Sequence, residues 1–313
     1  MKAAVFEGRK APQMLAIREV AKPEPGDGQV LVRVVAASIN AADVRSMRMG
    51  IVRKGRIMGA DIAGRVEAVG KGVSRFKPGD EVLAELPTPG FGGFAEYAAA
   101  PETTVTLKPA GVLFEEAAAL PMASCTALQA LKNWGGVKAG QKVLIVGASG
   151  GVGTYAVQLA KHLGADVTAV CSARSGAKAA ELGADRVVDY AKGGFTRDGC
   201  RYDRILAVNG SYPLTVYRRL LAENGVCVLI GGSLKQIFKC MLFGALVSTG
   251  GRQIRLLSAK PGAADLAYIA GLAAQGVVAP VIDRGYPLDE AAEAVRYVGE
   301  GHARGKVVLR VGA

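Results

Sequence analysis

Residues 142–174 read KVLIVGASGGVGTYAVQLAKHLGADVTAVCSAR, and this stretch decides the fold. An apolar run ends at Gly147, a glycine-rich turn extends to Gly153, and an amphipathic helix is predicted over 151–164. Glycine permits positive φ and removes the Cβ, so a pyrophosphate can approach the backbone, and the helix N-terminus offers free N–H groups to it. Because the turn lies between a predicted strand and a predicted helix, it indicates a dinucleotide site more strongly than an ordinary tight turn.

Strands and helices alternate on both sides of this stretch, from about 117 to 258. The predicted strands are continuous apolar runs, which is typical of a parallel sheet covered on both faces. The pattern therefore predicts a doubly wound Rossmann sheet. Strands are predicted at 142–147, 166–172, 186–190, 204–208 and 226–232, and helices at 114–134 (interrupted by Pro121), 151–164, 175–183 and 214–225.

The flanking sequence is different and rich in short strands. Residues 29–39 and 61–70 carry β-branched side chains between Gly and Pro, and in 76–86 the turn Pro78-Gly79-Asp80 leads into another strand. Short, closely spaced strands of this kind favour a partly open, β-rich barrel. A helix at 264–276 and a final strand at 305–311 follow, and no helix comes after that strand, so we expect it to return to the β-rich domain. The fold class is thus α/β, with a Rossmann domain at 117–258 inserted into a discontinuous β-rich domain at 1–116 plus 259–313.

Composition narrows the class of protein. The 313 residues fit two domains, and the net charge is +12 with five cysteines at spacings that suit neither a disulfide framework nor a Cys-x-x-Cys metal site. The basic residues are scattered, without the interleaved aromatics of single-strand binders, so nucleic acid is not an expected partner. No apolar run could cross a bilayer and the first residues do not resemble a signal peptide, so we expect a cytoplasmic protein without a membrane partner.

The second strand of the Rossmann pattern predicts which dinucleotide binds. An NAD site usually carries Asp or Glu about 20 residues after the glycines. Here Ser172 and Arg174 occupy that region, with Lys178 one turn later. A hydroxyl and a guanidinium suit a 2′-phosphate, so the expected cofactor is NADPH. The alternative is that Arg174 and Lys178 are only solvated surface charges.

An ordered series of motifs resembles a known family across nearly the whole chain. With residues 140–161, the matching stretches are SINAADVRSMRMG (38–50), GADIAGRVEAVG (59–70), FKPGDEV (76–82), GGFAEYA (92–98), AAALPMASCTALQAL (117–131), LGAD (182–185), YDRILAV (202–208) and GKVVL (305–309). The chain resembles the medium-chain dehydrogenase/reductase superfamily, in its zinc-free quinone oxidoreductase branch.

The resemblance implies a GroES-like first domain, a homodimer joined through sheet edges of the cofactor domains, and a set of NADPH contacts. Leu256 would border the nicotinamide. The simpler interpretation of Tyr190 is a strand-end aromatic, and that of Asn209 is a turn. The implied contacts are Thr126, Ser149, Gly150, Gly151, Val152, Ser172, Tyr190, Asn209, Ile230, Gly231, Gly232 and Ser233.

Zinc-dependent relatives take their ligands from an early Cys, a His-Glu pair and a later Cys or carboxylate. Here Asn40 stands where the early Cys is expected, and Ala60-Asp61 stand where the His-Glu pair is expected. The two histidines of the chain, His162 and His302, lie elsewhere in the sequence. Zinc needs three or four converging N, S or O ligands, so no metal site is expected. Asp61 alone has no evident partners in the sequence.

Without a Lewis acid, a substrate that delocalises charge needs the least help, so we expect reduction of a quinone or an α,β-unsaturated carbonyl by hydride transfer. Asn40 is the candidate catalytic residue, because its amide can donate to a developing oxyanion. Its alternative role is to satisfy loop backbone groups. The segment after Asn40 is expected to be a loop and lacks the tyrosine that similar quinone reductases often carry. The apolar stretch 233–252 predicts a helix at a dimer interface, at the mouth of a cleft, or in plain core.

Two other functions stay open. The first is an enoyl or 2-alkenal reductase, which would yield a saturated carbonyl and not a quinol. The second is a non-catalytic NADPH-binding or RNA-binding protein, which would bind RNA in a salt-sensitive way and turn over no electrophile.

Overall fold

The computed structural model describes residues 1–9, 14–87, 91–197 and 199–312. Its chain divides into two compact units: Met1–Cys125 with Pro261–Ala313, and Thr126–Lys260. The sequence places these boundaries at 116/117 and 258/259. The helix α3 (Pro121–Gln129) begins in the first unit and ends in the second.

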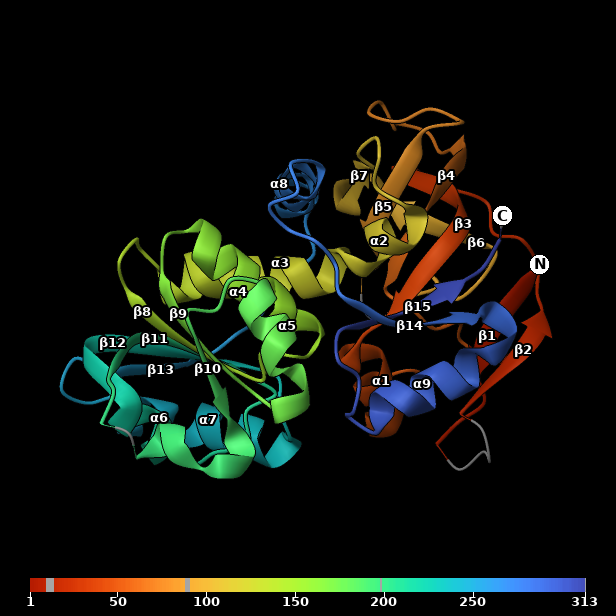
Figure 1. The fold of residues 1–313 in the computed structure, drawn as a ribbon. Helices are drawn as coiled ribbons and strands as arrows, with labels where there is room; N and C mark the ends of the chain where they lie inside the picture. The colour runs from red at the N-terminus through yellow and green to blue at the C-terminus, as the bar shows by residue number, and fades with distance from the viewer. Residues whose placement is uncertain (10–13, 88–90, 198, 313) are drawn as a thin grey trace. The chain divides into compact units, whose positions relative to one another are not determined.

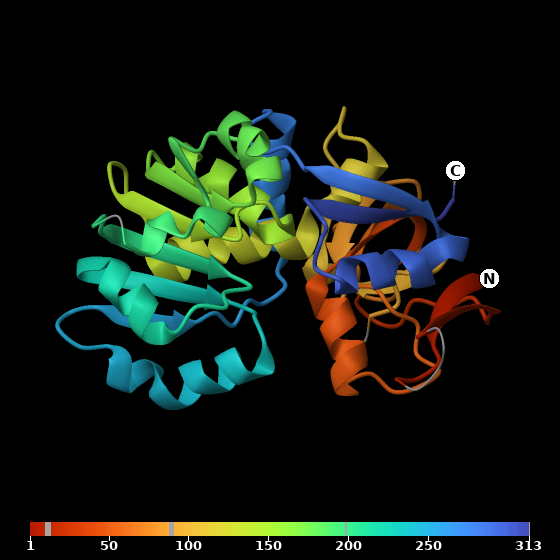
Figure 2. The same ribbon diagram turned by 60° about the horizontal axis from the view of Figure 1, so that its bottom comes forward.

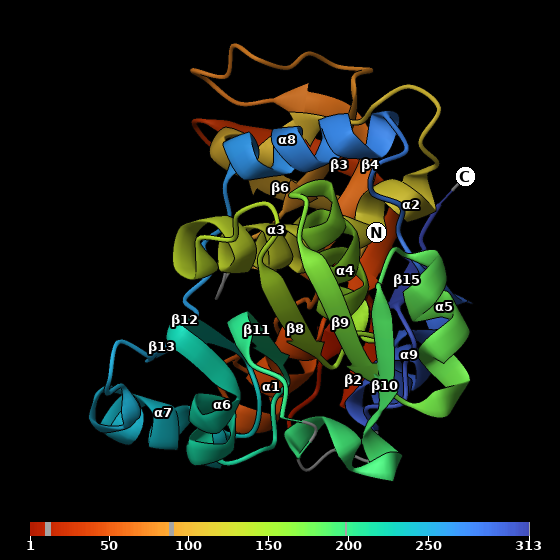
Figure 3. The ribbon, with the colours of Figure 1, turned by 60° about the vertical axis from the view of Figure 1, so that its left-hand side comes forward.

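The second unit is built on a six-stranded sheet in the order β10-β9-β8-β11-β12-β13, and every pair in it is parallel. Figure 3 shows the strands in this order. The predicted doubly wound Rossmann sheet is therefore confirmed. The strands are β8 (Lys142–Val146), β9 (Asp166–Cys171), β10 (Arg186–Asp189), β11 (Tyr202–Val208), β12 (Leu221–Ile230) and β13 (Gln253–Leu256).

Helices cover both faces of this sheet (Figure 1). The helices α4 (Gly151–His162) and α5 (Gly176–Glu181) lie on one face, and α6 (Leu214–Leu220) and α7 (Leu234–Val247) lie on the other. This distribution follows from right-handed crossovers that run outward in opposite directions from β8 and β11. Shorter turns complete the unit: a π-helix at Ala130–Gly135 and 3₁₀ turns at Ala173–Ser175, Tyr190–Lys192 and Gly194–Thr196.

The first unit contains a mostly antiparallel sheet in the order β14-β15-β3-β4-β5-β7, in which β6 also pairs with β3, and a separate β1-β2 ribbon. The last strand, β15, pairs with β3, so the expected return of the C-terminal strand is confirmed (Figure 2). The strands are β1 (Lys2–Phe6), β2 (Leu15–Glu19), β3 (Gln29–Ile39), β4 (Asp61–Val69), β5 (Glu81–Glu85), β6 (Tyr97–Pro101), β7 (Val105–Leu107), β14 (Ile282–Pro287) and β15 (Lys306–Arg310).

The helices of the first unit pack around this sheet and its apolar core, which includes Met58, Ile62 and Phe94. They are α1 (Ala41–Met49), α2 (Phe114–Ala119), α8 (Ala263–Ala274) and α9 (Ala291–Gly299), with 3₁₀ turns at Glu102–Thr104 and Leu288–Glu290. The break predicted at Pro121 is confirmed, because α2 ends at Ala119 and α3 begins at Pro121.

Two local predictions were wrong. The helix predicted over 214–225 ends at Leu220, because Leu221 is extended and begins β12, where it pairs with Tyr202 of β11. The loop expected after Asn40 is instead the helix α1, and its Met47 side chain is fully buried in the core. Tertiary packing outweighed local signals at both places.

Candidate active site

The glycine-rich turn has the backbone geometry that a diphosphate cradle requires. Gly147 has φ of +79°, and a Cβ at this position would lie 2.5 Å from the carbonyl oxygen of Val208. A Cβ on Gly153 would lie 2.1 Å from the carbonyl oxygen of Gly147. These two glycines therefore let the end of β8 and the start of α4 approach each other closely. The helix begins at Gly151, so its free N–H groups face the turn.

The sheet order gathers most of the predicted cofactor contacts at one edge. Because all six strands are parallel, their carboxyl ends share that edge, and chain order reverses between β8 and β11, where ligands bind in open α/β sheets. Each of the six strands ends at or just before a predicted contact or the turn that holds several of them. In sheet order these positions are Tyr190, Ser172, Gly147, Asn209, Gly231 and Leu256.

The side chains near the end of β9 differ in the hydrogen-bond and ion-pair partners that they already have. The Ser172 hydroxyl lies 3.3 Å from the hydroxyl of Ser175. Arg174 is exposed on the following 3₁₀ turn. Lys178 is exposed on α5 and forms an ion pair with Glu181, so it has a counterion of its own. Arg174 is thus better placed than Lys178 to meet an added phosphate.

The remaining predicted contacts occupy varied positions. Tyr190 is exposed, and Asn209 has φ of +51° while its N–H donates to the carbonyl of Ile230. Gly231 and Gly232 also have positive φ, and the Ser233 hydroxyl accepts from Gln236 N–H as the N-cap of α7. Ile230 and Thr126 are buried, and Thr126 belongs to the helix α3. The half-buried contacts are Ser149, Gly150, Gly151, Val152 and Leu256.

The first unit contains a buried polar group of six residues, hereafter the Asp61 cluster. Its members come from three adjacent strands of the sheet, from their neighbour β5, and from the start of α1. The cluster consists of Ser38, Asn40, Asp43, Asp61, Glu85 and Lys306.

Strand register brings these residues together. Asp61, the first residue of β4, stands opposite Ser38 on β3 and opposite Glu85 on β5. Lys306 begins β15, which pairs with the same end of β3. Asn40 follows β3 directly as the N-cap of α1, and the Asp43 carboxylate in the first turn accepts from its backbone N–H at 2.7 Å.

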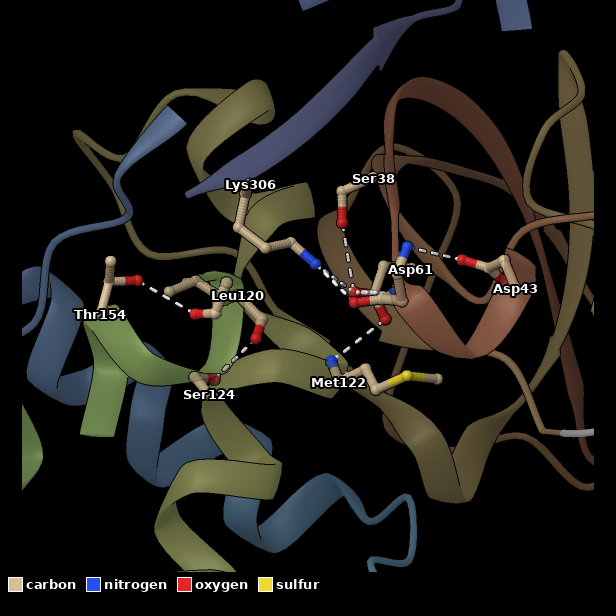
Figure 4. A network of polar contacts seen from close by, with 10 residues as sticks. Ser38, Asp43, Asp61, Leu120, Met122, Ser124, Thr154 and Lys306 are labelled. Carbon is tan, nitrogen blue, oxygen red and sulfur yellow. Dashed lines mark hydrogen bonds and ion pairs between the residues drawn. The ribbon is translucent and has the colours of Figure 1, made fainter. Parts of the chain in front are cut away.

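The Asp61 carboxylate is held from several sides (Figure 4). Its Oδ2 accepts from Asn40 Nδ2 at 2.8 Å and from the Ser38 hydroxyl at 3.2 Å, and its Oδ1 accepts from Met122 N–H at 3.1 Å. Lys306 Nζ lies 3.4 Å from Oδ2 and donates to Asn40 Oδ1 at 2.6 Å. Asp61 and Lys306 therefore form a buried ion pair, with Asn40 bonded to both.

The cluster has three carboxyl groups around one ammonium group. Burial, together with the nearby charge of Asp61, raises the pKa of Asp43 to about 7 and that of Glu85 to about 8. Asp61, which faces Lys306 directly, is the carboxylate that the ammonium neutralises. Near neutral pH the cluster thus has groups that can hold or release a proton.

Asn40 is fixed in one orientation by this arrangement. Its carbonyl oxygen accepts from Lys306 and its Nδ2 donates to Asp61. An amide nitrogen has two N–H bonds, so a second donor is left after the bond to Asp61. Asn40 is also the N-cap residue of α1, in a capping box with Asp43, so the alternative role of satisfying local backbone groups stays a prediction beside the catalytic one.

Lys306 is a member that sequence reasoning missed. The sequence was searched only for further zinc ligands beside Asp61, whereas the strands surround this carboxylate with hydrogen-bond donors. The motif GKVVL at 305–309 contained the signal, but only the pairing of β15 with β3 gives it meaning. Within the described part of the chain, no group of three or more His, Cys, Asp or Glu side chains converges as metal ligands would.

Comparisons with known proteins agree with this architecture. Residues 26–110 match the alcohol dehydrogenase GroES-like domain, and residues 182–309 match a family described as zinc-binding dehydrogenase. A chloroplast envelope quinone oxidoreductase homolog of Arabidopsis thaliana is 37% identical over 93% of this chain and 92% of its own. The chain belongs to the medium-chain dehydrogenase/reductase superfamily, in its quinone oxidoreductase branch.

Other members of the superfamily have similar coverage. The mitochondrial NAD(P)H oxidoreductase RTN4IP1 of Bos taurus is 33% identical over 90% of this chain and 82% of its own. The 2-methylene-furan-3-one reductase of Solanum lycopersicum is 33% identical over 93% of this chain and 74% of its own. A solved quinone oxidoreductase from Coxiella burnetii has a TM-score of 0.91 at 29% identity, covering 100% of this chain and 99% of its own.

This member of the superfamily is therefore an oxidoreductase that uses a nicotinamide cofactor. The described residues contain no helix with the length and apolarity needed to cross a bilayer. Two of the relatives are named for the chloroplast envelope and the mitochondrion, so the cytoplasmic location stays a prediction.

Proposed function

We propose that this protein is an NADPH-dependent reductase that transfers a hydride to a quinone or a similar conjugated carbonyl without zinc. The observation that carries the proposal is the Asp61 cluster. Asn40 and Asp61 stand where metal-dependent relatives are expected to hold zinc ligands, and the cation bonded to both is the ammonium of Lys306. A metal ion there would have to displace an ammonium that is buried beside the same carboxylate.

Three features support NADPH as the cofactor. The turn from Gly147 to Gly153 is shaped for a diphosphate, the end of β9 offers the Ser172 hydroxyl, and the exposed Arg174 follows. Residues 171–180 contain no carboxylate that would repel a 2′-phosphate.

Titration of Arg174→Ala with both reduced cofactors tests this preference. Loss of a charge-assisted contact should weaken NADPH binding by roughly tenfold and leave NADH binding unchanged. Arg201→Ala, a change at an exposed arginine far along the chain, is the matched control. Equal or tighter binding of NADH by the unmodified protein would overturn the choice of cofactor.

Asn40 is proposed as the residue that receives the substrate oxygen. When bound, the reduced nicotinamide supplies the hydride, and negative charge then develops on the oxygen of the acceptor. The second N–H of the Asn40 amide is the donor for that charge, and the bonds to Lys306 and Asp61 hold the amide ready for it. A conjugated acceptor spreads the charge, so it depends least on a metal.

Kinetics of Asn40→Ala and Asn40→Ser test this role. We expect kcat with a quinone to fall by about 10² to 10³, as when an oxyanion donor is removed, with NADPH affinity unchanged. Activity that resists exhaustive chelation, at a measured zinc content well below one ion per chain, is the accompanying expectation. Unchanged kcat in both variants, or loss of activity on chelation restored by zinc, would contradict the mechanism.

A second candidate is reduction of an activated C=C bond, which the relative named 2-methylene-furan-3-one reductase favours. Both reactions place negative charge on an oxygen after hydride transfer, so the same Asn40 donor serves either. Product analysis separates them: a quinol from a quinone panel, or a saturated carbonyl from a panel of enones and enals.

We also propose a homodimer joined through sheet edges. The strand β13 is the edge of the six-stranded sheet and pairs only with β12 among the described strands. An unpaired edge offers backbone N–H and C=O groups to a second copy. Light scattering of the purified protein tests this, and a monomer at micromolar concentration would contradict it.

A further inference from the structure

Helix α7 (Leu234–Val247) presents its large apolar side chains outward. Among the described residues, six of the twelve exposed large hydrophobic side chains belong to this helix, and they are between 45% and 72% exposed. They recur at helical spacing and so form one continuous surface, hereafter the α7 face. The α7 face consists of Leu234, Phe238, Met241, Leu242, Phe243 and Leu246.

The fully buried residues of the same helix are small or polar, and Val247 at its end packs against the core of the unit. Gln236, Cys240 and Gly244 are buried at intervals of four residues, and a Cβ on Gly244 would lie 3.6 Å from the carbonyl oxygen of Ile254 on β13. The Gln236 amide donates to the carbonyl of Tyr212 at 2.8 Å. The helix thus already packs on its sheet through these residues, and the exposed side chains of the α7 face take no part in that packing.

The arrangement inverts the ordinary one for a helix on a globular domain, in which the apolar stripe faces the core. Figure 2 shows α7 as the outermost helix on its face of the unit's sheet. A contiguous apolar patch of this kind marks an interaction surface.

The stretch of sequence that contains α7 is basic. Between Glu223 and Asp265 the chain carries five basic residues and no acidic one. Two of them, Lys235 and Lys239, are exposed on α7 itself, and helical spacing places them among the apolar side chains. A helix that exposes apolar side chains together with lysines, whose long stems let the ammonium groups reach the headgroups, matches the surface of an anionic bilayer.

We propose that the α7 face docks this reductase onto the surface of an anionic lipid membrane. The helix has 14 residues, a length of about 21 Å, which is too short to span the hydrocarbon core, so it lies in the plane of the interface. The sequence-based expectation of no membrane partner considered only spanning segments, and an interfacial helix is outside that test.

A second copy of the chain fits the same face less well. Direct pairing of two α7 faces would bring together two helices that each carry Lys235 and Lys239 and no carboxylate, whereas the dimer proposed above pairs the edge strands β13. If the substrate is an apolar quinone, it dissolves in the lipid surface to which α7 docks, so docking brings the enzyme to its substrate. This consequence rests on the proposed function, whereas the docking itself does not.

Vesicle flotation of the full-length protein tests the proposal. The probes are vesicles of phosphatidylcholine with phosphatidylglycerol, compared with phosphatidylcholine alone, at about 0.1 M salt. We expect binding to the anionic vesicles, weakened by at least about a hundredfold in Phe238→Ser/Leu242→Ser and by roughly thirtyfold in Lys235→Gln/Lys239→Gln.

Matched controls change equally exposed residues elsewhere. Leu107→Ser/Leu113→Ser removes two exposed leucines of the first unit, and Lys71→Gln/Lys192→Gln lowers the net charge by the same two units. Both should bind vesicles as the unmodified protein does, and all variants should retain NADPH binding, which reports folding.

Two results would overturn the proposal. One is the absence of anionic-vesicle binding by the unmodified protein; conversion of a dimer to a monomer by Phe238→Ser/Leu242→Ser would then identify a second copy as the occupant. The other is vesicle binding that the α7 variants leave unchanged.

Discussion

Lys306 and Asp61 form an ion pair that is removed from water, since the two side chains are 2% and 0% exposed. Removing one partner of such a pair leaves a buried charge without compensation. We therefore expect Lys306→Met to lower the free energy of unfolding by about 3 to 5 kcal/mol, measured by urea denaturation. The double variant Lys306→Met/Asp61→Asn should recover most of the loss, because no charge then remains.

An exposed pair provides the control for this prediction. Lys2 lies 3.4 Å from Asp289 and both side chains are at least half exposed, so Lys2→Met should cost less than about 1 kcal/mol. A single Lys306→Met variant as stable as this control would show that the pair contributes nothing.

Asp43 makes stability depend on pH in a direction opposite to that of most carboxylates. Burial raises its pKa from 3.8 to about 7 in the folded protein. The folded state therefore keeps this proton between pH 4 and 7 while the unfolded state loses it. Stability from this group is fully present below pH 4 and is lost as the pH rises through 7.

The difference in unfolding free energy between the unmodified protein and Asp43→Asn should accordingly shift in favour of the variant from pH 4 to 7. Asp80→Asn is the control: a hydrogen bond from Lys77 lowers the pKa of Asp80, so its effect should be constant over this range and change only at lower pH. A difference that is flat for both variants would refute the protonation of Asp43.

The residue scale also shows where sequence reasoning stops. Asn40 was singled out from its motif, and the structure places it in a polar cluster as a candidate site requires. Lys306 was not singled out, because it is 245 residues from Asp61 in the chain and meets it only through strand pairing. The spacing of residues along the sequence cannot predict a contact that only strand pairing creates.

Among the elements, the turn between β8 and α4 tolerates an added side chain least. Gly153→Ala would place a methyl group 2.1 Å from the Gly147 carbonyl oxygen, so strand and helix must separate. We expect loss of NADPH binding by at least about tenfold and destabilisation by roughly 1 to 3 kcal/mol. Cofactor titration and thermal unfolding measure the two effects.

Gly271→Ala is the matched change in another helix. It lies within α8, and a Cβ there meets nothing within 4 Å. Alanine should stabilise that helix by about 0.5 to 1 kcal/mol without changing NADPH binding. Equal effects of the two substitutions would contradict the close approach at Gly153.

Helices and strands were predicted well where a long periodic pattern of apolar residues ended at a glycine or at a change of period. The strands β8, β9 and β11 and the helix α4 are confirmed, each bounded by glycine or by a change of period. The failures came where packing overrides the local pattern, as at Leu221, which continues a helical sequence yet is fully buried in a strand. The inverted amphipathicity of α7 could not be read from its apolar composition, since that composition suits core equally.

At the scale of the whole molecule, the first unit depends on both ends of the chain. β15 lies between β14 and β3 in its sheet, so deletion of residues 305–313 removes an interior strand together with Lys306. We expect the first unit to unfold while a fragment near 126–260 resists protease, as judged by mass spectrometry of a limited digest. Deletion of residues 312–313 alone, which lie beyond β15, should leave the digestion pattern unchanged, and equal resistance of both deletions would contradict the dependence.

The same discontinuity sets an order of events during synthesis. Asp61 leaves the ribosome 245 residues ahead of Lys306, an interval on the order of tens of seconds at ordinary translation rates. During that time the inserted unit, whose sequence is continuous, can finish folding, whereas the carboxylate of Asp61 must stay hydrated. The N-terminal strands are thus made first and completed last, and for that interval they depend on whatever shields nascent chains from aggregation.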